Sequence, residues 1–420
     1  MPPETLLASH ILPVSHPPIA DGFIRVENGR ITAIGRIADL PDSPEKQAYI
    51  NNPNKTIITP GLINTHCHLE QSFGSRVEKT PDQPMSSWLR RVTERNRAHA
   101  TPEDLKNRCR RGVQELISTG TTFVNDISGL HGISLEVLEE SGLRAVVSPE
   151  FFHPAHDPVQ IDAVLALYQT LSGQYQNHPR LRVGLSPHTP FNVSPNAWRK
   201  ILENDPNLLI HTHIAESLDE SAWVEGKPSD IATLHRLFVQ RDFPPLQPDI
   251  SPVAYLAQFG LLTSETIAAH LVETNAGDRE ILKQSGVRIA HCPRSNMFLQ
   301  NKTLRWPDWE NTGIPIGLGT DGHLSTENLD LRAEARTAMA LHGWSAEQAL
   351  RIMTLDGARV MNLDPETGSL EPGKLDDLAL WHGPGSLAGL PPEDQALSAE
   401  TTLNRIMVGG HPITPAGVPA

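Results

Sequence analysis

Eight short apolar runs recur between residues 56 and 322, and each ends in polar residues or glycine before a segment with helical patterning. Such an alternation favours parallel strands that are joined by crossover helices. Eight units of strand and helix predict an α/β fold of the closed (β/α)8 type, a TIM barrel. The runs are TIITPGLINTHCH, GTTFVNDIS, GLRAVVSPEFF, RLRVGLSPHTP, NLLIHTHIAES, ETIAAHLVE, GVRIAHCPRSN and IPIGLGTDG.

The segment between the first two runs carries the signals of a crossover helix. Thr101 is a good N-cap, Pro102 suits the first turn, and Gly120 marks the end. Between them lies an apolar stripe at helical spacing, formed by Leu105, Cys109, Val113, Leu116 and Ile117. The alternative fold is an open doubly wound sheet, but the glycine-rich phosphate loop expected after its first strand is missing.

Both ends of the chain read as short strands. Residues 23–34, FIRVENGRITAI, alternate around Asn28-Gly29, the preferred pair for a type I′ hairpin turn. From about residue 366 the chain returns to β-like runs, as in GSLEPGKLDDLALW. We therefore expect residues 1–57 and 366–420 to form a small β-sandwich domain beside a catalytic barrel of residues 58–365.

Net charge and cysteine content restrict the partners and the compartment. The formal net charge of −14 disfavours nucleic acid and anionic membranes, because both require a basic surface. Small molecules are therefore the expected ligands. The sequence contains no run of eighteen apolar residues and no secretory signal. Its three widely spaced cysteines suit a reducing compartment, so the cytoplasm is the expected location.

Histidines gather at the C-terminal ends of the runs, where a barrel of this kind places its active site. The spacing of His66 and His68 turns both imidazoles to one face of a strand. Three imidazoles and one carboxylate suit a catalytic divalent metal that keeps one position open for water. We expect His66, His68, His213 and Asp321 to be the ligands, rather than polar strand ends capped by their own loops.

Other residues at these ends suit supporting roles. Glu216 follows His213 by three residues, at the height where it could take the proton of a hydrolytic water and pass it to a leaving nitrogen. His270 is either a further ligand or a hydrogen-bond partner of that water, and we favour the second role. His211 shares the face of His213 and is expected to pack or to orient a ligand. His291 suits strand-end packing as well as a functional role.

Three residues are candidate substrate contacts. His188 lies in SPHTP at the end of the fourth run. Arg294 follows the seventh run and could grip a carboxylate or sugar hydroxyls, the alternative being a surface arginine paired with a loop acid. Trp88 could stack on a heterocycle, the alternative being an aromatic core residue. The fourth run has no lysine to bridge a second metal, so one metal is expected.

The motifs PGLINTHCHLE, SPHTP, HTHIAES, HCPRSN and GTDG, in this order, resemble the amidohydrolase superfamily and its chlorohydrolase/deaminase branch. The resemblance continues through LDGARVMNL and GSLEPGKLDDLALW, and so covers nearly the whole chain. It implies one divalent ion, Zn²⁺ or alternatively Fe²⁺, on His66, His68, His213 and Asp321. It also implies Glu216 as the proton shuttle.

Within that branch, SSWLRRV, GTTFVNDIS and HCPRSN look most like aminodeoxyfutalosine deaminases, with adenosylhomocysteine and methylthioadenosine deaminases as relatives. Those enzymes usually carry a small-residue SSN pattern after the aspartate, whereas this chain reads GHLSTENLDL. We expect His323 and Thr326 of this loop to lie at the mouth of the site and to alter what fits.

The expected function is that of a metal-dependent aminohydrolase, acting on C–N bonds other than peptide bonds. Its expected substrate is an aminated heterocycle, an adenine nucleoside such as aminodeoxyfutalosine, from which ammonia is released. An alternative keeps the site but acts on a triazine, guanine or another ring, by dehalogenation or cyclic amide hydrolysis. A non-enzymatic scaffold is disfavoured, because no ligand position is vacant. Barrels of this class often dimerise, so a homodimer is one expected state.

Overall fold

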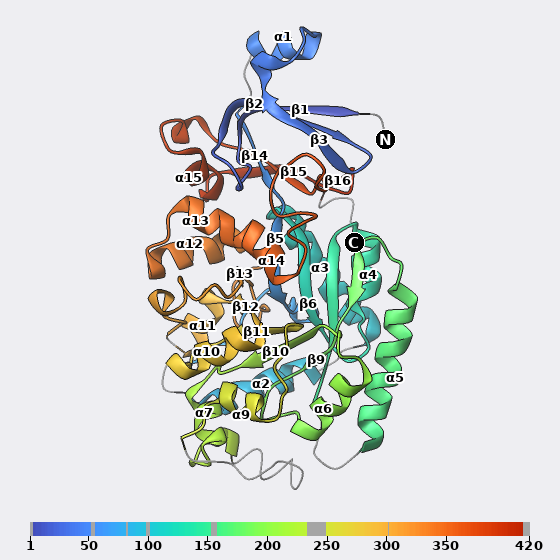
Figure 1. The fold of residues 1–420 in the computed structure, drawn as a ribbon, viewed down its shortest axis with the longest axis vertical. Coiled ribbons are helices and arrows are strands. Elements are labelled where there is room, and N and C mark those ends of the chain that lie inside the picture. The colour runs from blue at the N-terminus through green and yellow to red at the C-terminus, as the bar shows by residue number, and fades with distance from the viewer. Residues whose placement is uncertain are drawn as a thin grey trace.

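The fold has two parts, a sheet built from both ends of the chain and a larger α/β body (Figure 1). The computed structural model describes residues 3–51, 55–80, 83–97, 101–152, 158–232, 249–300 and 302–414. Among these residues, no helix is long and apolar enough to cross a lipid bilayer.

The described residues contain the parallel strands predicted from the eight runs, in two hydrogen-bonded sets, β5-β6-β7-β8 and β10-β11-β12-β13. The fourth run forms two short strands, β8 and β9, of which β9 pairs with β7. The strands are β5 (Leu62–Cys67), β6 (Thr121–Ser128), β7 (Arg144–Phe151), β8 (Leu181–Val183), β9 (Ser186–Pro187), β10 (Ile210–Ile214), β11 (Thr266–His270), β12 (Arg288–His291) and β13 (Ile316–Leu318).

Parallel bridges between Leu185 and Ile210 and between Cys67 and Asp321 join the two sets. The N–H of His211 donates to the Leu185 carbonyl at 2.9 Å, and the N–H of Asp321 donates to the His66 carbonyl at 3.0 Å. These bonds link the strands into the ring of a (β/α)8 barrel, so the predicted fold class is confirmed.

Helices follow the strands and cover the outside of the barrel (Figure 1). Thr101 caps α3 as predicted, because its hydroxyl accepts the N–H of Asp104. The helices of this part are α2 (Met85–Arg97), α3 (Pro102–Ser118), α4 (Ser134–Ser141), α5 (Pro158–Tyr175), α6 (Pro195–Asn204), α7 (Leu218–Val224), α9 (Pro252–Gln258), α10 (Ala276–Ser285), α11 (Pro293–Gln300), α12 (Leu331–His342), α13 (Ala346–Arg351) and α14 (Gly357–Val360).

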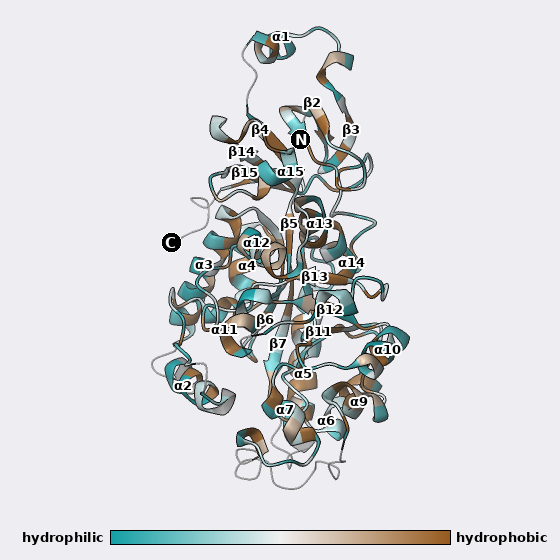
Figure 2. Cartoon of the chain, turned by 90° about the vertical axis from the view of Figure 1, so that its left-hand side faces the viewer, coloured by the Kyte–Doolittle hydropathy of each residue, from teal (hydrophilic) through white to brown (hydrophobic). Residues whose placement is uncertain are grey.

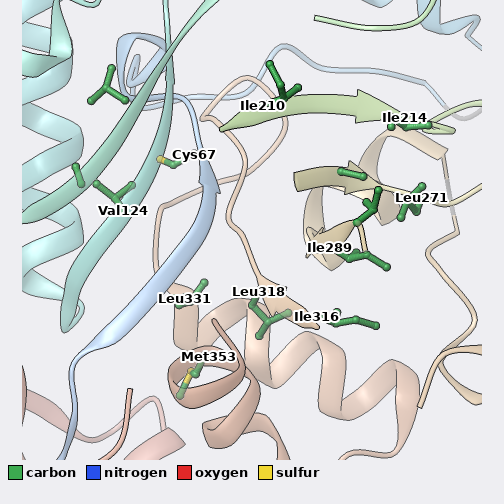
Figure 3. Close-up of a cluster of buried hydrophobic side chains, with 14 of the residues drawn as sticks. Cys67, Val124, Ile210, Ile214, Leu271, Ile289, Ile316, Leu318, Leu331 and Met353 are labelled. Carbon is green, nitrogen blue, oxygen red and sulfur yellow. The ribbon is translucent and has the colours of Figure 1, made fainter. Parts of the chain in front are cut away.

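Apolar side chains fill both sides of the strands. Those inside the ring include Ile63, Phe123 and Ile267, whereas a larger cluster lies between the strands and the helices (Figure 3). Figure 2 shows polar and apolar residues alternating around the peripheral helices, as expected for helices with one buried face. Burial on both faces explains why the strands read as continuous apolar runs.

Both termini contribute to one seven-stranded sheet in the described part of the chain, with the order β16-β15-β14-β4-β1-β2-β3. Asn28 and Gly29 have φ values of +51° and +77°, so the predicted hairpin turn is confirmed. The predicted domain limits stay a prediction. The elements are β1 (Glu4–Ile11), β2 (Ile19–Glu27), β3 (Arg30–Arg36), α1 (Pro44–Asn51), β4 (Thr56–Pro60), β14 (Leu378–His382), α15 (Pro392–Leu397), β15 (Thr402–Val408) and β16 (His411–Ile413).

The first apolar run serves both parts of the molecule. Its first half is β4 in the terminal sheet, and its second half is β5 in the barrel. The change falls at Gly61, where an added Cβ would lie 2.0 Å from Oγ1 of Thr122. A glycine is required there because the chain passes this close to β6.

A buried ion pair connects the two parts. Nε of Arg144, on β7, lies 2.6 Å from Oδ2 of Asp377, whose Oδ1 accepts the N–H of Gly409 at 3.0 Å. The side chains are 12% and 1% exposed. Removing one partner of such a pair leaves an uncompensated buried charge.

We expect Asp377→Ala to lower the free energy of unfolding by about 3 to 5 kcal/mol, measured by chemical denaturation. The control is Glu366→Ala, which removes the exposed pair of Arg30 and Glu366 and should cost at most about 1 kcal/mol. Equal losses in the two variants would contradict a special role for the buried pair.

Candidate metal centre and active site

The C-terminal ends of three barrel strands bring three histidines and one aspartate together. His66 and His68 come from the end of β5, His213 from β10, and Asp321 from just after β13. The Nε2 atoms of His68 and His213 are 3.3 Å apart. Oδ1 of Asp321 lies 3.8 Å from Nε2 of His66 and 3.6 Å from Nε2 of His68. The four predicted ligands therefore form one buried cluster.

The nitrogens of this cluster suit a divalent ion. Nε2 of His66 is buried and has no hydrogen-bond partner among the described residues. Burial and the neighbouring imidazoles hold the pKa of His66 well below its usual range, and burial lowers the pKa of His68 to about 4. Both rings are therefore neutral at neutral pH. Neutral imidazoles that face a carboxylate fit the donor set of Zn²⁺ or Fe²⁺.

Asp321 is held as an ionised acceptor. The N–H of Gly322 donates to its Oδ1 at 2.7 Å. The hydroxyls of Ser295 and Ser325 donate to its Oδ2 at 2.6 and 2.9 Å. Burial raises the pKa of this carboxyl, but attraction to the imidazoles, led by His68, and the Ser295 bond outweigh burial, so the net pKa is lowered. The carboxylate is thus charged and fixed in orientation.

His211 and Asn125 support His66 from behind. Nδ1 of His66 lies 3.0 Å from Nε2 of His211, and Nδ1 of His211 lies 2.7 Å from Nδ2 of Asn125. A metal on Nε2 of His66 would require the proton on Nδ1, which would then donate to His211. This position suits the orienting role predicted for His211. Sequence reasoning misses Asn125, because a single amide inside a strand has no distinguishing pattern.

His188 lies beside His213 at the end of β9. The Nδ1–H of His213 donates to the His188 carbonyl at 3.0 Å, which turns Nε2 of His213 toward the cluster. Oε1 of Glu150 lies 3.8 Å from Nε2 of His188 and 3.8 Å from Nδ1 of His213. It has no hydrogen-bond partner among the described residues. Sequence reasoning misses Glu150, although its place at the end of the third run is a signal that could have found it. The substrate contact of His188 stays a prediction.

Glu216 lies above the end of β10 on strained backbone. The preceding Ala215 has a φ of +53°, in the left-handed region. The carboxylate of Glu220 accepts the N–H groups of Ala215 and Glu216 at 3.0 and 2.9 Å and so holds this turn. Burial raises the pKa of Glu216 to about 7, which suits a group that both accepts and gives protons. Glu220 is a further residue that sequence reasoning misses.

His270 presents a ring nitrogen to Glu216. Its Nδ1–H donates to Oδ1 of Asn296 at 2.8 Å, and its Nε2 lies 3.8 Å from Oε1 of Glu216. Because Nδ1 carries the proton in this bond, Nε2 is an acceptor that can bind a water or a metal ion. His270 also belongs to a group of potential ligand atoms with His66 and Asp321. Both roles considered for His270 are compatible with this geometry.

Arg294 and Trp88 are engaged by the protein itself. The guanidinium of Arg294 contacts the carboxylates of Glu327 and Glu334 at 2.5 and 3.5 Å. Trp88 is 6% exposed as a residue and lies in an apolar cluster, and its ring N–H donates to the Val77 carbonyl at 2.7 Å. These surroundings match the alternatives stated for both residues, a paired arginine and a core aromatic. Their contacts with a substrate stay predictions.

His291 points away from the cluster, toward the helix layer. Its Nε2 lies 3.1 Å from Nε2 of His342 at the end of α12. Trp344 packs near both rings, and His291 is fully buried. These contacts match the packing alternative for His291.

A barrel whose strand ends gather neutral imidazoles, an ionised aspartate and a buried glutamate is built as a metal-dependent hydrolase. Comparison of the sequence with known proteins identifies the family. The chain belongs to the amidohydrolase family, whose model matches residues 57–413. The predicted family and the predicted hydrolase acting on C–N bonds are thereby confirmed.

The chain is similar to several proteins named as deaminases. It is 31% identical over 372 residues to the 5′-deoxyadenosine deaminase of Methanobrevibacter smithii, covering 86% of this chain and 79% of that protein. It is 30% identical over 430 residues to the 8-oxoguanine deaminase of Pseudomonas aeruginosa, covering 93% and 89%. Its fold matches that of Helicobacter pylori aminofutalosine deaminase with a TM-score of 0.81, at 22% identity over 98% of this chain and 100% of that chain.

We expect Gly319→Ala to displace His66. A Cβ at residue 319 would lie 2.6 Å from Cβ of His66 and 2.9 Å from its backbone N, so β5 would have to move. The variant should retain less divalent metal per chain after dialysis, measured by elemental analysis. Gly173→Ala in α5, where nothing lies within 4 Å of the added carbon, is the matched control and should keep its metal. Unchanged metal content in Gly319→Ala would contradict the prediction that His66 is a metal ligand.

The pair of His291 and His342 should make stability depend on pH. Burial lowers the pKa of His342 from 6.5 to about 4. As the pH falls, His342 is therefore protonated in the unfolded chain before it is protonated in the folded one, which favours unfolding. The contribution of neutral His342 to the free energy of unfolding is complete above pH 6.5 and is lost as the pH falls toward 4. We expect the free energy of unfolding to fall less steeply over this range in His342→Leu, measured by denaturation at each pH. Identical slopes would show that His342 does not contribute.

Proposed function

We propose that the chain is a metal-dependent hydrolytic deaminase of an adenine nucleoside. The observation that carries the proposal is the pairing of Glu216, with a pKa near 7, and His270 beside the His66, His68, His213 and Asp321 cluster. A carboxyl that exchanges protons at neutral pH next to a metal-ligand set is the arrangement that hydrolytic loss of ammonia requires.

One divalent ion, Zn²⁺ or alternatively Fe²⁺, would be held by His66, His68, His213 and Asp321. When bound, it would supply Lewis-acid activation of a water and polarise the reacting ring. The buried Nε2 of His66, which lacks a partner among the described residues, supports this assignment. The three donors to Asp321 keep its carboxylate charged and aimed at the imidazoles.

The side chains themselves account for the proton transfers. Glu216 accepts a proton from the hydrolytic water and delivers it to a ring nitrogen as the water oxygen attacks the carbon that carries the amine. Glu216 then takes the second proton, from the oxygen that is now bonded to the ring carbon, and gives it to the amine; the C–N bond breaks, ammonia leaves and a C=O bond forms. Nε2 of His270, 3.8 Å from Oε1 of Glu216, accepts a hydrogen bond from the same water and orients it. Glu220 keeps Glu216 in place by holding its backbone N–H.

The substrate class rests on the relatives. The 5′-deoxyadenosine deaminase of M. smithii supports an adenine nucleoside, and within that class we propose aminodeoxyfutalosine as one substrate to test. His188, beside His213, is the best-placed predicted contact for the heterocycle. Arg294 and Trp88 would contact substrate only if the loops that engage them rearranged.

A second candidate is a deaminase of a free purine base. The 8-oxoguanine deaminase of P. aeruginosa is 30% identical to this chain over a longer share of it, 93%. The site chemistry is the same in both candidates, because water attacks a ring carbon in each. The substrate is therefore the feature that distinguishes them.

The remaining proposals concern partners and location. The net charge of −14 supports a small-molecule substrate and no nucleic acid partner. We propose a cytoplasmic enzyme that forms a homodimer, which sedimentation of the purified protein would test.

The decisive experiment is ammonia release from the metal-loaded enzyme on a panel of rings. The panel contains 5′-deoxyadenosine, adenosine, methylthioadenosine, adenosylhomocysteine, aminodeoxyfutalosine, guanine and 8-oxoguanine. A chlorotriazine is tested in parallel for release of chloride, because dehalogenation yields no ammonia. Release from an adenine nucleoside would support the first candidate. Release from 8-oxoguanine or guanine, but from no nucleoside, would support the second. Chelation should abolish either activity.

We expect Glu216→Gln to keep its metal and to lose at least about a hundredfold in kcat, because the amide cannot carry a proton. The matched control is Glu203→Gln, an exposed glutamate of α6, which should leave kcat unchanged. Metal content by elemental analysis and steady-state kinetics are the measurements. Full activity in Glu216→Gln would remove this residue from the mechanism.

A further inference from the structure

The loop after Asp321 differs from the mouth loop predicted from its sequence. His323 is 3% exposed and Thr326 is 1% exposed, so both are buried and serve contacts within the protein. The hydroxyl of Thr326 donates to the Asn328 carbonyl at 3.1 Å. We call residues 322–329 the post-β13 loop, and residues 72–80 with 83–97, which follow His68, the post-β5 segment.

His323 connects three parts of the chain through its two ring nitrogens. Its Nδ1 accepts the N–H of Gly74, in the post-β5 segment, at 3.0 Å. Because Nδ1 accepts, Nε2 carries the ring proton, and this Nε2–H donates to Oε2 of Glu115 in α3 at 2.8 Å. The other oxygen of Glu115 accepts the N–H of Leu329 at 3.0 Å. Glu115 thus anchors the post-β13 loop at two points, one near each end.

The anchored loop also carries the donors that orient Asp321. Gly322, next to His323, donates its N–H to Oδ1 of Asp321 at 2.7 Å. Ser325, two residues after His323, donates its hydroxyl to Oδ2 of Asp321 at 2.9 Å. Gly322 also lies against His68, because an added Cβ would be 3.1 Å from Cβ of His68. Displacement of the loop would therefore disturb two of the predicted metal ligands together.

Further contacts bind the loop to the post-β5 segment. The N–H of Val77 donates to the Leu324 carbonyl at 3.0 Å, and Arg76 pairs with Glu327 at 2.6 Å. Leu324 is buried in an apolar cluster with Trp88. The exposed ion pair contributes little to stability, so the two segments are held by the backbone bond of Val77, the packing of Leu324 and the side-chain hydrogen bonds of His323. Among these, only the His323 side chain also reaches Glu115 in α3.

We propose that Glu115 and His323 form a positioning pair that fixes the Asp321 carboxylate and joins the post-β5 segment to the metal cluster. Neither residue touches the reacting atoms. They act through Gly322 and Ser325 on Asp321 and through Gly74 on the chain that follows His68. The inference rests on the proposed metal-dependent function for its catalytic consequence, but its effect on metal retention does not depend on which substrate the enzyme takes.

The test compares two substitutions at His323 with a matched control. His323→Leu removes both hydrogen bonds at similar volume, whereas His323→Gln keeps an N–H that can reach Glu115. The control, His342→Leu, removes a histidine hydrogen bond outside the predicted metal cluster, between His291 and His342, on the outer side of the barrel. All three variants are first loaded with Zn²⁺ and checked for folding by circular dichroism.

The readouts are the rate of zinc loss to a chelator, the melting temperature, and kcat and KM on the best substrate of the panel. We expect His323→Leu to lose zinc at least about tenfold faster and to lose at least about tenfold in kcat, with KM changed less than about threefold. His323→Gln should recover part of both losses. His342→Leu should lower the melting temperature without changing zinc loss or kcat.

The proposal is overturned if His323→Leu loses zinc no faster than His342→Leu, or if His323→Gln is as impaired as His323→Leu. A fall in melting temperature alone would also overturn it, since that would be a merely structural role. If the unchanged protein deaminates no ring of the panel, the proposed function fails, while the chelator rates still decide this inference. If it deaminates and zinc retention is unaffected, the inference alone fails.

Discussion

The backbone hydrogen bond from the N–H of Asp321 to the carbonyl of His66 belongs both to the barrel and to its site. It joins the end of β13 to β5 and so makes one of the two junctions of the ring, the other being the bridge between Leu185 and Ile210. The same bond brings two of the predicted ligands together from distant parts of the sequence. The approach is possible because Gly319 leaves room for the His66 backbone. This junction of the barrel therefore also places Asp321 beside His66.

Unfavourable features collect at the same strand ends. The residues with left-handed backbone there are Ala215, His270, Leu271 and Asp321. Neutral imidazoles and buried carboxyls lie beside them, among which burial raises the pKa of Glu150 to about 8. Strained backbone and buried ionisable groups reduce stability unless neighbouring contacts or a ligand compensate for them. Their occurrence together at one end of the barrel, beside the predicted ligand set, marks that end as the functional one.

Periodicity predicted the barrel because strands buried on both faces read as apolar runs, and it placed the candidate ligands because strand ends define the site. It could not show that the run containing Ile58 and Ile63 divides between two sheets, since that depends on pairing with β1 and β14. The roles of Asn125 and Glu150 depend on contacts with histidines of other strands, which a single stretch of sequence does not show. The inward position of His323 likewise depends on Glu115, a helix residue far away in the sequence.

The terminal sheet also determines the order in which this chain can complete its fold. β4 lies between β1 and β14, and β14 pairs with it along Thr56–Pro60. A growing chain therefore makes β4 early and carries an unpaired edge there until residues 378–382 have been synthesised. Unpaired edges are templates for association with other chains. Prematurely terminated products would keep that edge open, which makes them natural targets for chaperones and proteases.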